Sequence, residues 1–146
     1  MRRPQTVDVV ASLATSDYDL TQDANLFANL CMVTPALVDE LDATDFAKLT
    51  EAFNEFSEFE PLENYAPGDS IALVAPIKVD GKECVSVKMR RPKTKDLREA
   101  QSASVTAAGQ DVVLYAALTG LTSEQINQLD WSDMRKIKRV YAGFLE

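Results

Sequence analysis

The chain has 146 residues, of which 46% are hydrophobic and 26% charged, and this composition is typical of a soluble globular protein with one or two small domains. It contains no histidine, the commonest general base and metal ligand, and no apolar run approaches the ~18 residues that a membrane span needs. A net charge of −8 opposes nucleic acid as the main partner, and no secretory signal is present, so we expect a cytoplasmic protein.

The first half of the chain predicts helices. Thr34 followed by Pro35 marks the start of a short helix, because both residues suit the first turn. Asp42 can cap the next helix, and Asp45 lies in its first turn near the positive end of the helix dipole. The apolar residues of this helix follow the helical spacing and predict one buried face: Phe46, Leu49, Phe53 and Phe56.

The segment Phe59–Asp69 is rich in proline and acidic residues, which is typical of a linker. It divides the chain into a first unit, residues 1–58, and a second unit, residues 70–146. The two cysteines, Cys31 and Cys84, have apolar neighbours and are expected to be buried free thiols rather than a disulfide.

A β-hairpin is expected after this linker. The segments Ser70–Lys78 and Lys82–Met89 have strand-like composition, and Asp80-Gly81 between them suits a type I′ turn. Pro76 has no amide donor, so the first strand should lie at an edge there or contain a bulge.

Two helices follow the hairpin. Thr94 is a suitable N-cap for a short helix that extends to about Ser104. A second helix, expected to begin near Gln110, is apolar nearly all round and should be buried. Gly120 stands where a left-handed residue often ends a helix.

The last two helices have clear start signals. Thr122 and Gln125 have the spacing of a capping box, and Asp130 can cap the final helix with Asp133 in its first turn. The apolar stripe of the final helix is Met134, Ile137, Tyr141 and Phe144. The sequence therefore predicts a mainly helical α+β fold with one hairpin before the second unit.

The two units are similar in sequence. Residues 1–58 align without a gap with residues 89–146, and 19 of the 58 pairs are identical, where chance gives roughly three or four. The aromatic residues Phe27, Phe53, Tyr115 and Tyr141 stand at matched positions and are expected in the core. We interpret the pattern as a tandem duplication. Either the first unit has lost its strands and packs against the hairpin of the second, or translation begins upstream of Met1.

Residues 71–146 resemble the tail assembly proteins of Mu-like and related phages. The residues that carry this resemblance are Val79-Asp80-Gly81, Arg91-Pro92 with Thr94 and Asp96-Leu97, Leu118-Thr119-Gly120-Leu121, and Leu129-Asp130 with Asp133. Residues 26–56 look like the same helical segment, except that Met32 stands at the position of Gly120.

The resemblance implies a non-enzymatic chaperone in the host cytoplasm that binds the helical tape measure protein and assists assembly of the tail tube. An alternative is a structural tail or baseplate-associated subunit that stays in the virion. Residues 1–70 carry three bases against fourteen acids, −11, and residues 71–146 twelve bases against nine acids, +3. Opposite charges on the two halves predict a head-to-tail homo-oligomer.

The candidate partner-binding residues are cations and one tryptophan: Arg90, Arg91, Trp131, Arg135, Lys136 and Arg139. Trp131 could instead cover the core beside the preceding short helix. The basic run from Lys88 to Arg98 could bind phosphate, but pairing with acids is favoured, within the chain or between subunits. The first unit supplies such acids, including Glu51, Glu55, Glu58 and Glu60. No residue pattern indicates a catalytic group, a cofactor site or a metal site, since capping explains the paired aspartates at the helix starts.

Overall fold

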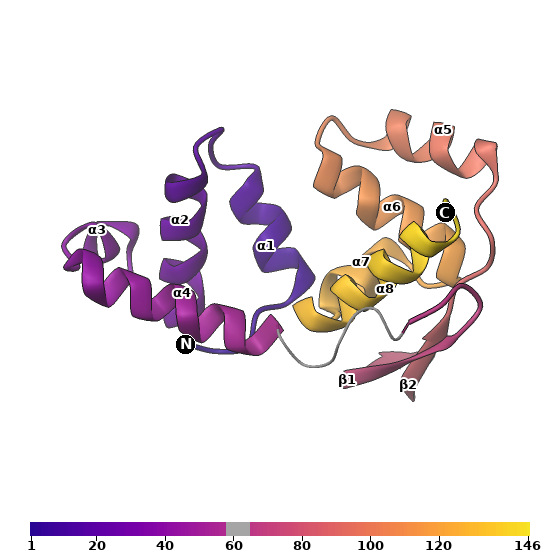
Figure 1. Ribbon diagram of the computed structural model, residues 1–146, viewed down its shortest axis with the longest axis horizontal. Coiled ribbons are helices and arrows are strands. Elements are labelled where there is room, and N and C mark those ends of the chain that lie inside the picture. The colour runs from indigo at the N-terminus through magenta and orange to yellow at the C-terminus, as the bar shows by residue number, and fades with distance from the viewer. Residues whose placement is uncertain (58–64) are drawn as a thin grey trace.

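The computed structural model describes residues 1–57 and 65–146. Its helices form two groups, and a two-stranded antiparallel sheet lies beside the second group (Figure 1). The first helix group contains α1 (Thr6–Leu13), α2 (Asp19–Cys31), α3 (Pro35–Asp39) and α4 (Ala43–Ser57). The second contains α5 (Thr94–Ala103), α6 (Ala107–Thr119), α7 (Ser123–Gln128) and α8 (Trp131–Gly143). The predicted mainly helical α+β fold is confirmed.

Helix starts in the first group follow the predicted signals. α3 begins at Pro35, directly after Thr34 at the cap position. α4 begins after Asp42, whose carboxylate accepts a hydrogen bond from the Thr44 amide over 2.8 Å. This bond satisfies one of the amides that the first turn of a helix leaves unpaired. Of the predicted linker, residues 59–64 lie outside the described residues, and residues 65–69 contain a turn.

The hairpin is confirmed, with β1 at Ser70–Val79 and β2 at Lys82–Lys88. Asp80 and Gly81 both have positive φ, 52° and 75°, as a type I′ turn requires. The register shifts between Ala72 and Ile77, so Pro76 lies in the irregular segment where a missing amide interrupts no pairing.

In the second group two predicted boundaries are wrong by one and three residues. Thr94 is the first residue of α5 rather than its cap, because the Asp96 carboxylate accepts the Lys93 amide over 2.8 Å. α6 begins at Ala107 and not near Gln110, because the Thr106 hydroxyl accepts the Gly109 amide. The predicted start of α7 and cap of α8 are confirmed by the bonds Gln125 N to Thr122 Oγ1 and Ser132 N to Asp130 Oδ1.

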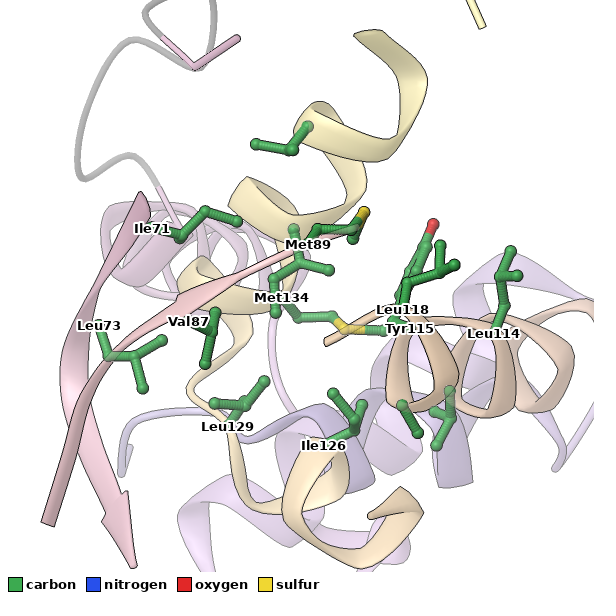
Figure 2. Packing of buried hydrophobic residues seen from close by; sticks show 14 of the residues in the cluster. Ile71, Leu73, Val87, Met89, Leu114, Tyr115, Leu118, Ile126, Leu129 and Met134 are labelled. Carbon is green, nitrogen blue, oxygen red and sulfur yellow. The ribbon is translucent and has the colours of Figure 1, made fainter. Parts of the chain in front are cut away.

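Two clusters of buried apolar side chains form the core. The smaller, in the first group, is centred on Val9, Leu26, Phe27 and Leu30. The larger joins the hairpin to the second group, and Figure 2 shows strand residues facing side chains from α6, α7 and α8. The predicted stripes of α4 and α8 pack against these clusters through Phe46, Leu49, Phe53, Met134, Ile137, Tyr141 and Phe144. The cysteines Cys31 and Cys84 are free and partly buried.

Several contacts recur at an offset of 88 residues. Arg2 forms a bidentate ion pair with Asp8, and Arg90 forms the same pair with Asp96. The other recurring contacts are the backbone bonds Arg2 N to Leu30 O and Arg90 N to Leu118 O, both 3.0 Å, and the aromatic pairs Phe27–Phe53 and Tyr115–Tyr141. The two groups therefore share these local contacts as well as sequence identity at matched positions.

The helix ends at Met32 and Gly120 differ in backbone strain. Both residues are left-handed, with φ of 55° and 78°, but only glycine adopts this conformation without a steric cost from Cβ. We expect Met32→Gly to raise the free energy of unfolding by about 1 kcal/mol, because the exposed Met32 side chain contributes little packing. Gly120→Ala should lower it by a similar amount, and urea denaturation of both variants measures the two effects. A destabilising Met32→Gly would contradict the strain argument.

Candidate functional site

Lys136 is one of the candidate partner-binding cations, a role that requires an exposed side chain, but the structure places it inside the protein. Its side chain is 3% exposed, and Nζ donates to the Ala72 carbonyl over 3.0 Å and lies 3.3 Å from Asp133 Oδ1. The expectation of an exposed cation at this position is therefore wrong. Its acceptor belongs to β1, which lies 64 residues earlier, so no local pattern revealed the burial.

Asp133 on α8 accepts hydrogen bonds from the hairpin. Its fully buried carboxylate accepts the Val74 amide at 2.9 and 3.0 Å and the Ala75 amide at 3.3 Å. These amides lie within the irregular segment of β1, where they are not used by the strand pairing with β2. Burial raises the pKa of Asp133, although the two amides and the Lys136 ammonium oppose this shift.

The first group contains the same two residue types at the same spacing in a different setting. Lys48 Nζ lies 2.7 Å from Asp45 Oδ1, but the side chains are 68% and 53% exposed. The structure describes no strand packed on this part of α4. Identical chemistry therefore gives a surface pair in one unit and a buried anchor for a hairpin in the other.

Trp131 lies between the two helix groups. It is partly buried and packs against both core clusters, and its amide donates to the Pro4 carbonyl over 2.9 Å. Together with Arg135 and Val10 it lines a small cavity beside α1. This position agrees with the covering role considered from the sequence and connects the two cores.

The remaining candidate cations lie on two separate segments. Arg90 and Arg91 precede α5, and Arg90 is engaged with Asp96, whose pKa is lowered by the guanidinium. Arg139 lies on α8, 3.1 Å from Glu146. None of the described ion pairs joins the basic run to Glu51 or Glu55. The other two acids expected as partners, Glu58 and Glu60, lie outside the described residues. Partner binding by these arginines stays a prediction.

An ion pair that the sequence analysis missed joins the two helix groups. The Arg3 guanidinium contacts both carboxylate oxygens of Asp130, at 2.7 and 3.1 Å, and its Cζ lies 5.2 Å from the centre of the Phe56 ring. Burial acts to raise the pKa of Asp130, but the hydrogen bonds from Arg3 and Ser132 outweigh it and lower the pKa. The recurrence of Arg-Pro in both units was visible in the sequence, but its acidic partner was not.

Backbone hydrogen bonds complete this contact, which we call the junction. The Thr6 amide and hydroxyl both donate to the Leu129 carbonyl, at 2.8 and 3.1 Å. Gln5 and Asp130 form an isolated antiparallel bridge beside it. The segment from Arg3 to Thr6 therefore binds the loop between α7 and α8 through main-chain and side-chain groups together.

The first group exposes large apolar side chains that its core does not use. Tyr18, Met32 and Leu37 are 76%, 85% and 58% exposed. The residues 88 positions later are Thr106, Gly120 and Gln125, which are polar or small. The two units thus differ in surface chemistry at these matched positions, and only the first exposes large apolar side chains there.

A groove of about 510 Å³ opens between α2, α3 and α4 of the first group. Its apolar lining includes Leu20, Ala24, Val38, Leu41 and Phe46. In the second group the matched helices face α1. The groove therefore marks a surface that is covered in one unit and open in the other.

Within residues 1–57 and 65–146, no group of three His, Cys, Asp or Glu residues is placed to hold a metal ion. Among the same residues, no helix combines the length and apolar character that crossing a membrane requires.

The family model described as phage tail assembly chaperone proteins, E, or 41 or 14, matches residues 1–58 and 70–146. No curated protein and no solved structure matched the chain.

Proposed function

The chain belongs to the phage tail assembly chaperone family, which is not an enzyme family, and we propose that it binds the helical tape measure protein of its phage. The family match over nearly the whole chain carries this proposal. We further propose that binding takes place in the host cytoplasm and precedes formation of the tail tube.

The exposed apolar side chains of the first group are the proposed contact surface. A long helical partner presents an apolar stripe that associates with other copies when it is not covered. Tyr18, Met32 and Leu37 offer complementary apolar area, and large exposed side chains of this kind are often the centre of a binding site. Tube subunits that bind the same stripe more tightly would then displace the chaperone.

The candidate arginines are proposed as a separate contact with the same long partner, because Arg90 and Arg91 precede α5, at the other end of the molecule from α3. Arg90, Arg91, Arg135 and Arg139 would pair with acidic residues beside the stripe of the tape measure protein. Pairs of this kind at a solvated rim mainly affect the association rate and its dependence on salt. The tail tube protein is a second proposed partner, because it takes over the covered helix.

The two units suggest a matched test of the contact surface. A triple variant combines Tyr18→Thr, Met32→Gly and Leu37→Gln. Each residue is thereby replaced by the one that stands 88 positions later in the chain. Co-expressed with the tape measure protein, the original chain should co-purify with it and keep it soluble, whereas the triple variant should lose most of the bound partner. The fold should persist, because all three side chains are exposed.

The control carries three substitutions at exposed apolar residues of the hairpin and second unit, Val85→Ser, Val105→Asp and Leu145→Ser. It should retain binding. Equal loss in both variants would indicate a general effect of surface hydrophobicity, and no binding by the original chain would contradict the proposal. If the chain is then found in purified virions, the structural-subunit function takes its place.

A further inference from the structure

The junction between the two helix groups uses residues that the chain carries twice. Its donor segment, Arg3–Thr6, supplies the guanidinium and the threonine amide, and its acceptor loop, Leu129–Trp131, supplies the carbonyl and the carboxylate. At an offset of 88 residues, the second unit carries Arg91, Pro92 and Thr94, and the first carries Leu41 and Asp42. Each of these five residues is identical to its counterpart in the junction.

The second acceptor loop has the same local geometry as the first. The Leu41 amide donates to the Val38 carbonyl over 3.1 Å, as the Leu129 amide does to Ile126. Asp42 uses Oδ1 to cap α4, just as Asp130 uses Oδ1 to cap α8. Both oxygens of Asp130 also contact Arg3, whereas Asp42 is exposed and takes part in none of the described ion pairs.

The second donor segment is also in place. The Lys93 amide bonds to Asp96 Oδ2 over 2.8 Å, which matches the 2.9 Å bond from the Gln5 amide to Asp8 Oδ2. Arg91 and Thr94 are exposed, and no described hydrogen bond engages the Arg91 guanidinium or the Thr94 amide. The segment therefore retains the donors that Arg3 and Thr6 use within the junction.

These two surfaces do not meet within one chain. Figure 1 places α3, next to the acceptor loop Leu41–Ala43, at one end of the molecule and α5, next to the donor segment Arg91–Thr94, at the other. A contact between them requires two molecules. We propose that the donor segment Arg91–Thr94 of one copy binds the acceptor loop Leu41–Ala43 of a second copy and repeats the junction between chains.

The surroundings of the two surfaces are complementary. Docking of α5, a helix that carries Lys95 and Arg98, would cover the open groove, which Asp39 lines. Asp42 stands between Leu41 and Ala43, which also line the groove.

Side-chain size is complementary too. At the junction the short Val10 and the large Trp131 line the same cavity. In the proposed contact the long Arg98 takes the place of Val10, and the small Ala43 takes the place of Trp131.

The arrangement is heterologous, because each copy uses a different surface at its two ends. Such contacts close into a ring or continue as a filament, depending on the rotation between copies. With its groove covered by α5 of another copy, the first group would resemble the second group, in which α1 faces α6 and α7. This inference does not depend on the identity of the tape measure protein as a partner.

Sedimentation of the full chain over a range of protein concentrations tests the contact. The original chain should form assemblies whose mass rises with concentration and falls with added salt. Asp42→Asn, which keeps a capping side chain, and Arg91→Glu should each weaken association roughly thirtyfold or more, because each leaves one charge of the pair without its partner. An equal mixture of the two variants should form dimers and nothing larger, because only one intact contact is possible between them.

Asp45→Asn and Lys82→Gln are matched controls, since they make single charge changes at exposed positions outside both surfaces. They should associate like the original chain. A chain that stays monomeric at high concentration in low salt, or assemblies that weaken equally in controls and variants, would overturn the proposal. Circular dichroism of each variant shows whether its fold is retained.

Discussion

Replacing Asp133 with alanine is expected to lower the free energy of unfolding by about 3–5 kcal/mol, the range for removing one partner of a buried ion pair. The substitution leaves the Lys136 ammonium buried without its counter-charge. It also deprives the Val74 and Ala75 amides of their acceptor. Denaturation by urea at neutral pH measures the loss, and hydrogen exchange at the two amides should show that the hairpin opens first.

Asp45→Ala is the internal control for this prediction. Asp45 has the same lysine three residues later, but the pair is exposed, and exposed pairs contribute about 1 kcal/mol or less. Combining Asp133→Ala with Lys136→Met should recover part of the lost stability, because the buried charge is then removed. Similar small effects in Asp133→Ala and Asp45→Ala would contradict the assignment of a buried anchor.

Replacing Arg3 with glutamine should lower the free energy of unfolding by about 2 kcal/mol, because Asp130 remains buried with a charge that has lost its bidentate partner. The change should also loosen the contact between the helix groups. We therefore expect the loss to be accompanied by weaker protection from hydrogen exchange at the Thr6 and Trp131 amides, which bond across the junction.

Arg91→Gln provides the comparison. Arg91 stands 88 residues after Arg3 and is also followed by proline, but it is exposed, so its loss should leave stability within about 0.5 kcal/mol of the original chain. The same substitution should weaken association between copies. Equal destabilisation by both variants would contradict the view that one donor segment acts within the chain and the other between chains.

Predictions about local structure were largely accurate, and the errors have local causes. The hairpin turn, the bulge near Pro76 and the capping box of Thr122 depend on hydrogen bonds or dihedral angles within a few residues. The two misplaced helix starts, at Thr94 and Ala107, arose because several polar side chains nearby could cap. In the structure, Asp96 accepts the Lys93 amide at the start of α5, and Thr106 caps α6.

Predictions about the binding surface were less accurate, because exposure depends on which elements meet. Lys136 and Lys48 have the same neighbouring aspartate three residues earlier, yet one is buried beneath β1 and the other is exposed. Trp131 connects two cores that no local pattern links. The exposed Tyr18, Met32 and Leu37 were not chosen as candidates, although comparison with their matched polar or small residues could have identified them.

The sequence by itself determined the helices, the hairpin, the apolar stripes and the similarity of the two units, since each follows from periodicity, caps and turn residues close together in the chain. Only the tertiary structure decided which charges are buried and which surfaces are open. Arg3 pairs with Asp130, which lies 127 residues later, and Asp133 accepts hydrogen bonds from the amides of β1 only when the hairpin packs on α8. Such contacts depend on the relative placement of whole elements, which is set by packing of the two cores rather than by any local signal.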